Sequence, residues 1–192
     1  MSLLRSLSWL AVKGKAREAA CVDLGLRVGM ASRHATHYFP IEGAVADSGW
    51  FLIVADGHNH RLLEGDVLAT LSQGCEVLTC TVQESFLYSK ATGWRDGQRV
   101  WSVTYEGEDQ PGDVVAEGTL PVTFAILHQD LLAQSKADDA GDLLLDPLFE
   151  IPIEAVRQAV GYRPDKPRPA FEGRFARLEA VNPTVYQRLF GG

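Results

Sequence analysis

The sequence predicts an α+β protein with a mainly antiparallel sheet that helices cover on one face. Two observations predict this class. Residues 75–90 alternate between apolar and polar side chains, as in a strand with one buried face. The pair Asp96-Gly97 that follows is a strong signal for a two-residue hairpin turn. Hydrophobic residues make up 46% of the 192 residues and charged residues 22%, which is typical of a domain with a buried core.

The N-terminal third contains two predicted strand–helix units. Residues 8–14 form a short strand, and residues 15–24 have a helix-forming composition. Residues 49–55 form a strongly apolar strand, and a polar loop leads from it to a short helix over 66–74. The two units share an outline of strand, helix and glycine, which is compatible with an internal duplication that has since diverged. Two ferredoxin-like βαβ halves are one arrangement that this pattern allows. Residues 27–47 give no clear pattern.

The hairpin turn implies a register for the strands on either side of it. A type I′ turn needs positive φ at both central positions, which Asp96 and Gly97 tolerate. A two-residue loop then pairs Thr92 with Trp101 and continues this register away from the turn. The register predicts that one set of large side chains shares the buried face: Phe86, Tyr88, Trp101, Val103 and Tyr105.

The C-terminal half is predicted to contain the last elements of the domain, followed by a linker and a tail. We expect a third antiparallel strand over 114–120, a helix over 123–136 and a second helix over 152–161. Residues 1–162 therefore form a single α+β domain. Residues 163–192 begin with three prolines within a few positions, which indicates an extended linker, and end in a short apolar helix that we expect to dock on this subunit or on another.

Charge and cysteine content favour some partners and compartments over others. The net charge of −7 disfavours nucleic acid and anionic membrane surfaces, because both require a concentrated positive patch. A basic protein partner fits this acidic balance. Cys21, Cys75 and Cys80 form no CxxC pair and suit a reducing compartment. No secretory signal or membrane-length apolar run is found, so we expect a cytoplasmic protein.

Six short segments of the chain lie between residues 49 and 165. They are GWFLIV at 49–54, LSQGC at 71–75, ESFLYS at 84–89, WRDGQRVW at 94–101, FEIPI at 149–153 and GYRPD at 161–165. With these motifs, residues 50–165 resemble a bacterial family of uncharacterised proteins of unknown function. The resemblance implies a stand-alone bacterial α+β protein and supplies no activity.

Glu84 is the one weak candidate for a catalytic residue. Strand parity places it on the same face as Val82 and Phe86, where a carboxylate is costly unless it is paired. One interpretation is a general acid or base in a pocket. The alternatives are a salt bridge to Arg99 or Lys90, or a β-bulge that turns the carboxylate outward.

The hairpin also suggests a ligand site. Its aromatic side chains are candidates for the lining of a small-molecule cleft, although cross-strand aromatic pairs more often pack a core. These candidate ligand-binding residues are Tyr88, Trp94, Trp101 and Tyr105.

His58 and His60 are weak candidates for metal ligands. In an extended segment, an HxH pattern places both imidazoles on one side, and His34 and His37 lie upstream. A metal site needs a further ligand that the sequence does not identify. Histidines gathered by chance in a polar loop are the alternative.

Two classes of function remain. The segment Lys13-Gly14-Lys15 lacks the glycine and hydroxyl residue that a phosphate loop requires, and no nucleotide, zinc-protease or serine-hydrolase signature occurs. We therefore predict no cofactor and lean towards a non-catalytic interaction protein, such as an adaptor or an immunity-type inhibitor. Its partner would be another protein, and a homodimer is also compatible. The alternative is a small-molecule-binding protein or enzyme with a cleft around Glu84 and the hairpin aromatics.

Overall fold

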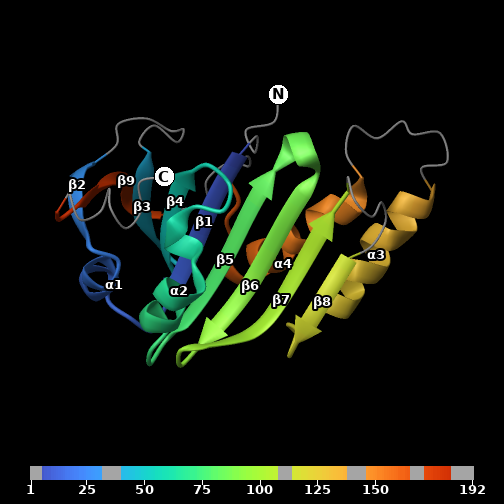
Figure 1. Cartoon of the computed structure of the whole chain (residues 1–192), viewed down its shortest axis with the longest axis horizontal. Helices are drawn as coiled ribbons and strands as arrows, with labels where there is room; N and C mark the ends of the chain where they lie inside the picture. The colour runs from blue at the N-terminus through green and yellow to red at the C-terminus, as the bar shows by residue number, and fades with distance from the viewer. Residues whose placement is uncertain (1–5, 32–39, 108–113, 138–145, 165–170, 183–192) are drawn as a thin grey trace.

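The computed structural model describes residues 6–31, 40–107, 114–137, 146–164 and 171–182. Within these residues, nine strands form one sheet in the order β2-β9-β3-β4-β1-β5-β6-β7-β8, as Figure 1 shows. The strands are β1 (Ser6–Lys13), β2 (Leu26–Ala31), β3 (Ile41–Ala46), β4 (Phe51–Asp56), β5 (Glu76–Gln83), β6 (Tyr88–Arg95), β7 (Gln98–Glu106), β8 (Val114–Gly118) and β9 (Phe171–Ala180).

Four α-helices and three single turns of 3₁₀ helix accompany the sheet in the described residues. The helices are α1 (Arg17–Asp23), α2 (Gly65–Leu71), α3 (Phe124–Ala137) and α4 (Glu150–Val160), and the 3₁₀ turns are η1 (Arg61–Leu63), η2 (Glu84–Phe86) and η3 (Pro147–Phe149). None of these helices has both the length and the apolar character that crossing a bilayer requires.

The predicted fold class is confirmed, because every neighbouring strand pair in the sheet is antiparallel. Strands β4 and β5 both pair with β1, so they run parallel to each other with β1 between them, and η1 and α2 connect them. This is a split β–α–β unit of the ferredoxin-like kind. The second expected half does not form in this way, because β4, β3 and β9 separate β1 from β2.

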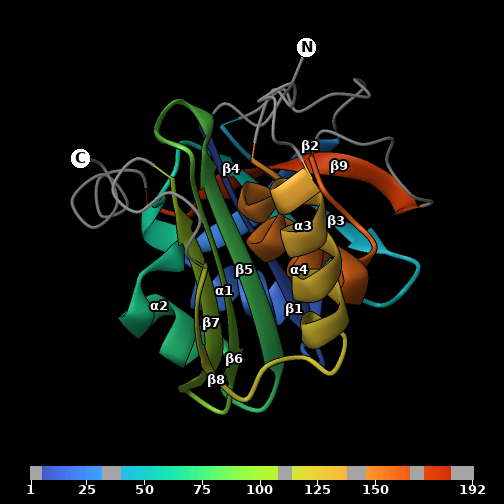
Figure 2. The ribbon, with the colours of Figure 1, turned by 90° about the vertical axis from the view of Figure 1, so that its right-hand side faces the viewer.

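Helices lie on both faces of the sheet rather than on one. Figure 2 shows α3 and α4 on one side and α2 on the other. The α4 side buries Trp9 and Leu52, whereas the side of α1 and α2 buries Leu10 and Ile53. Strands β1 and β4 are thus apolar on both faces, which requires a cover on each. The helices on the second face stop at α2, so β6, β7 and β8 have no helix in front of them in the view of Figure 1.

The hairpin turn forms as predicted, but the register beyond it does not. Asp96 and Gly97 have φ values of 50° and 79°, as a type I′ turn requires. A β-bulge then inserts Val100 between two pairs, so that Trp94 pairs with Arg99 and Gly93 with Trp101. From this point the strands are shifted by one residue relative to the predicted register.

The shift divides the predicted buried face. Trp101 and Tyr105 are buried under α4 and η3 as expected, but Tyr88 lies on the opposite face of the sheet. Phe86, in η2, is 53% exposed. Next to the bulge, the Trp101 indole ring lies so close to Gly93 that a Cβ atom there would overlap it. Only glycine allows the ring to lie across the neighbouring strand.

Part of the expected linker and tail belongs to the sheet. Residues Phe171–Ala180 form β9, which pairs with β2 on one side and with β3 on the other. Phe175 and Leu178 are buried in the two opposite core layers. Residues 163–192 therefore contribute an internal strand, and the expected terminal helix after Asn182 lies outside the described residues.

Candidate functional site

The face of β5, β6, β7 and β8 that points away from α3 and α4 carries mainly polar side chains, and some of these are buried (Thr79, Thr81, Thr92 and Ser102). On the opposite face of the same strands, Leu78, Ala91 and Val103 are buried in the core. Directly paired residues share a face in an antiparallel sheet, so the register identifies the residues of the open face. We call this surface the open face, and its central residues are Thr79, Thr81, Lys90, Thr92, Ser102 and Thr104.

A groove of about 300 Å³ runs between the open face and the η1–α2 segment. This volume is at the lower end of the range of about 300–1,000 Å³ that small-ligand sites occupy. Leu63 and Leu68 form part of its apolar wall. The residues that offer polar or aromatic groups to the groove are Asn59, Thr79, Thr81, Lys90, Thr92, Trp94 and Arg99.

A chain of hydrogen bonds fixes the floor of the groove. The hydroxyl oxygens of Thr79 and Thr92 lie 2.6 Å apart, and the Trp94 indole N–H donates to the Thr92 hydroxyl at 2.9 Å. The indole N–H is therefore satisfied within the protein. Trp94 offers its ring, rather than its donor, to anything in the groove.

The loop above the groove is tied to the sheet by two buried hydroxyls. The Ser8 hydroxyl donates to the Gly57 carbonyl at 2.8 Å and accepts the His60 backbone N–H at 3.2 Å. The Thr81 hydroxyl accepts the backbone N–H of Asn59 at 2.8 Å. These bonds hold the loop against the sheet and give the groove a fixed wall.

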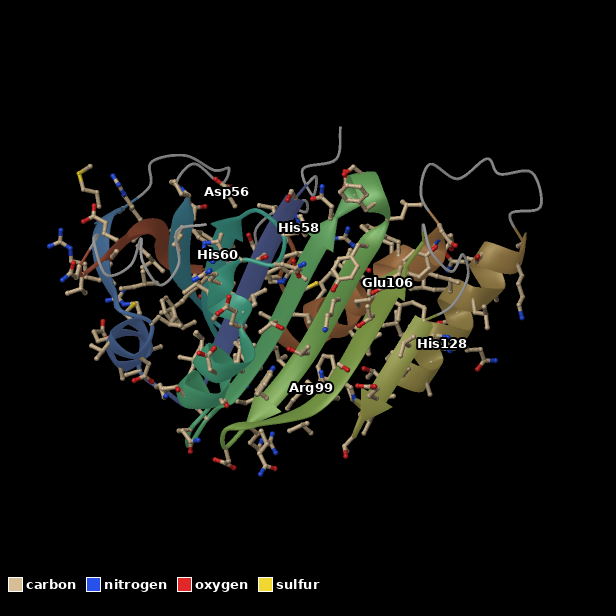
Figure 3. The ribbon with its side chains drawn as sticks, viewed as in Figure 1. Asp56, His58, His60, Arg99, Glu106 and His128 are labelled. Carbon is tan, nitrogen blue, oxygen red and sulfur yellow. The ribbon has the colours of Figure 1, made fainter. Side chains whose placement is uncertain are left out.

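Of the two cations that line the groove, one has an ion-pair partner and the other has none among the described residues. Arg99 donates to Glu117 at 3.0 Å, and the Ser102 hydroxyl donates to the same carboxylate at 3.2 Å. Lys90 is half-buried between Thr81 and Thr104. Within the described part of the chain, its side-chain ammonium has no hydrogen-bonding or ionic partner. Figure 3 shows Arg99 and Glu106 towards opposite ends of β7.

The structure separates the four aromatic residues that the sequence suggests as ligand-binding. Tyr88 and Trp94 lie on the open face, and Trp94 lines the groove. Trp101 and Tyr105 lie on the covered face, where the Tyr105 hydroxyl donates to Asp146 at 2.8 Å. Burial, followed by this hydrogen bond, raises the pKa of Tyr105, so it remains a neutral donor. One sheet thus cannot present all four side chains to one ligand.

A second cavity of about 270 Å³ lies beside the bulge. Trp94 and Trp101 both border it, together with Leu78 and Val100. Glu76 and Arg95, which also line it, form an ion pair at 3.6 Å. The walls of this cavity are mainly hydrocarbon, so it offers few groups that would orient a polar ligand.

Glu84 does not lie where strand parity places it. Strand β5 ends at Gln83, and Glu84 begins the 3₁₀ turn η2, which Leu87 closes in the left-handed conformation with φ of 46°. Glu84 therefore lies in a turn and not in the strand; it is half-buried and has an interaction partner. Neither of the two cavities described above is lined by Glu84.

The two candidate metal ligands have separate local roles. The His60 Nδ1 atom accepts the Leu62 backbone N–H at 3.2 Å and caps η1, whereas His58 Nδ1 lies 3.4 Å from the Ser6 hydroxyl. Burial lowers the pKa of His60, against a smaller opposing effect of Asp56. No group of three or more potential metal ligands occurs among the described residues, and His34 and His37 lie outside them.

Sequence reasoning missed the polar residues of the groove. The alternation over 75–90 identifies the buried side of the strand, whereas the groove residues lie on its other side. Thr79, Thr81 and Lys90 form the polar half of that same alternation. The available signal was Lys90 beside Thr92 on the polar side of this alternation, but the burial of Lys90 and its lack of a side-chain partner among the described residues follow only from the tertiary structure.

No family model, curated protein or solved structure matches the chain. The resemblance to an uncharacterised bacterial family therefore stays a prediction.

Proposed function

We propose that this chain is a non-catalytic, cytoplasmic interaction protein that binds a protein partner through the open face of β5–β8. The observation that supports this most is the contrast between the two faces of the same strands. One face is sealed under α3 and α4, whereas the other is polar, is bordered by η1 and α2 at β5 and β6, and has no helix over β7 and β8 among the described residues.

The bonding of the open face suits a preformed contact surface. Its threonine hydroxyls bond to each other, to Trp94 and to backbone groups, and its Arg99–Glu117 pair bridges β7 and β8. These contacts hold side chains in place before any partner arrives, which reduces the entropy lost on binding. Val115 adds a 56% exposed apolar side chain beside Thr104, and mixed polar and apolar surface is typical of protein interfaces.

Two matched variants test this proposal. Val115→Glu places a charge on the open face, whereas Val122→Glu makes the same change at a 97% exposed position outside the strands. Neither should unfold the protein, because both valines are exposed. Tagged wild type and both variants would capture partners from the native host, and captured proteins would be identified by mass spectrometry.

The proposal is supported by a partner that wild type and Val122→Glu bind and Val115→Glu does not. Calorimetry with the purified partner must then show at least about a tenfold loss of affinity for Val115→Glu. Equal binding by all three proteins would overturn the open face as the contact surface.

A further inference from the structure

We infer that the groove between α2 and the open face is a binding subsite for a carboxylate group, with Lys90 as its charged centre. The inference rests on the proposed function and deepens it, because the carboxylate would be an acidic side chain of the protein partner. The overall charge of −7 favours a basic partner, but recognition depends on the charges that the contact surface itself presents.

The groove contains hydrogen-bond donors that have no acceptor among the described residues. Thr79 and Thr92 share one hydrogen bond, and the Thr92 oxygen already accepts from Trp94. Whichever threonine donates, one of the two hydroxyl hydrogens remains without an acceptor among the described residues. The Lys90 ammonium adds three further donors without a partner there. A ligand that supplies acceptor oxygens would satisfy both groups.

The charge in the groove matches a single negative charge. Arg99 is neutralised by Glu117, whose carboxylate also accepts from Ser102. This leaves Lys90 as the uncompensated cation of the groove. A carboxylate carries one negative charge and would balance it, whereas a phosphate carries closer to two and would leave part of its charge unpaired in a half-buried place.

The shape and walls fit the stem of an acidic side chain. The volume of about 300 Å³ is small, and Leu63, Leu68 and the ring of Trp94 provide apolar contact beside the polar floor. Methylene groups next to a carboxylate would pack against these walls, since Trp94 directs its N–H into the protein. The groove opens onto the rest of the open face, so the backbone of the partner would lie across β6 and β7.

Nuclear magnetic resonance titration tests the inference directly. The probes are the Trp94 indole N–H and the backbone amides of Thr79 and Thr92. The ligands are sodium acetate, sodium chloride at equal ionic strength, and the capped peptides acetyl-Gly-Glu-Gly-amide and acetyl-Gly-Gln-Gly-amide. We expect saturable shifts with acetate and the glutamate peptide, and none with chloride or the glutamine peptide.

Variants assign the response to Lys90. Lys90→Met should weaken carboxylate binding about tenfold or more, and Thr79→Val should weaken it less. Lys136→Met removes the same charge from an exposed position near the end of α3 and should bind as wild type. No saturable shift, a shift that chloride reproduces, or full binding by Lys90→Met would overturn the subsite.

One comparison distinguishes the two possible sources of the carboxylate. A second comparison distinguishes failure of the subsite from failure of the proposed function. Tighter binding of the glutamate peptide than of acetate supports a side chain of a partner, whereas the reverse order assigns the groove to a small free acid. If Val115→Glu abolishes partner binding and Lys90→Met does not alter it, the contact surface stands and the subsite fails. If carboxylates bind at Lys90 but Val115→Glu binds the partner normally, the proposed function fails.

Discussion

The two faces of strands β5, β6 and β7 differ in burial and in polarity, although their residues alternate along the same strands. On the covered face, Cys80, Val103 and Tyr105 are 0 to 1% exposed beneath α4 and η3. On the open face, Thr81, Lys90 and Thr104 occupy neighbouring positions. Burial of the covered face stabilises the fold through the hydrophobic effect. The open face carries hydrogen-bond donors that have no acceptor within the described residues.

The treatment of positive charge shows the same difference. Arg163 is 5% exposed and donates to Glu150 and to Glu154, the latter at 2.8 Å, on the covered side near Cys80. A buried cation without such partners would destabilise the fold. Lys90 has no such partner among the described residues. A charge that folding does not neutralise is available for binding.

The largest expected difference between the faces is in thiol reactivity. In a Thr104→Cys variant, the new thiol should react with iodoacetamide at least about a thousandfold faster than Cys80, which must wait for unfolding. Burial also raises the pKa of Cys80 well above its ordinary value and so lowers its thiolate fraction. Peptide mass spectrometry after timed labelling measures both rates. Comparable rates in the folded protein, with equal rates in urea as the control, would contradict the assignment of the faces.

Loss of a large side chain should affect the covered face far more than the open one. Trp101→Ala is expected to lower the free energy of unfolding by about 3–5 kcal/mol, because it removes a buried indole and leaves a cavity. Thr104→Ala on the open face should change it by less than about 0.5 kcal/mol. Urea unfolding followed by circular dichroism measures both values. A similar loss in the two variants would show that the open face also has a structural cover.

Removing the two cations should separate a structural charge from one available for binding. Arg163→Met should cost about 3 kcal/mol of unfolding free energy, since it leaves the partly buried Glu150 carboxylate without this cation, whereas Glu154 keeps its ion pair with Arg157. Lys90→Met should change stability by less than about 0.5 kcal/mol, because no described partner is lost. Chemical denaturation of both variants checks this. A destabilised Lys90→Met variant would assign Lys90 a role in folding.

The smallest expected effect concerns His60, at the border of the open face. Burial lowers its pKa in the folded protein, so the unfolded chain binds the proton more readily. Stability from neutral His60 is therefore fully present above the unfolded pKa of about 6.5 and is lost as the pH falls through the folded value. Protonation at Nδ1 would also break the cap on Leu62. Amide exchange at Leu62 should accelerate at acidic pH, and His60→Asn, which retains a capping oxygen, should remove this acceleration. An unchanged pH dependence in His60→Asn would rule out His60 as its source.

Local chemistry explains which parts of the fold are predictable. The turn at Asp96-Gly97 depends only on the φ preferences of two residues, and it forms as the sequence predicts. Helix α4 ends at Val160, and Gly161, which follows it with a φ of 79°, closes it as the sequence predicts. These features need no partner from elsewhere in the chain.

The bulge residue Val100 decides which side chains reach the candidate site, and the local sequence pattern does not predict that bulge. The bulge at Val100 shifts the register by one, so Tyr88 lies on the opposite face from Trp101, which stays on the predicted buried face. A glycine inside a predicted strand is a known sign of a bulge or of close approach, so Gly93 was the available signal. Glu84 was misplaced for a similar reason, because η2 ends the period-two alternation before it.

The sequence by itself determined the antiparallel class, the turn and the alternation that makes one face of β5 apolar and the other polar. These follow from backbone preference and from a side-chain period of two, both of which act within a few residues. Tertiary structure alone decided which faces are covered, that β9 enters the sheet between β2 and β3, and that Lys90 remains without a partner among the described residues. Those outcomes depend on contacts between segments far apart in the chain, which no local pattern encodes.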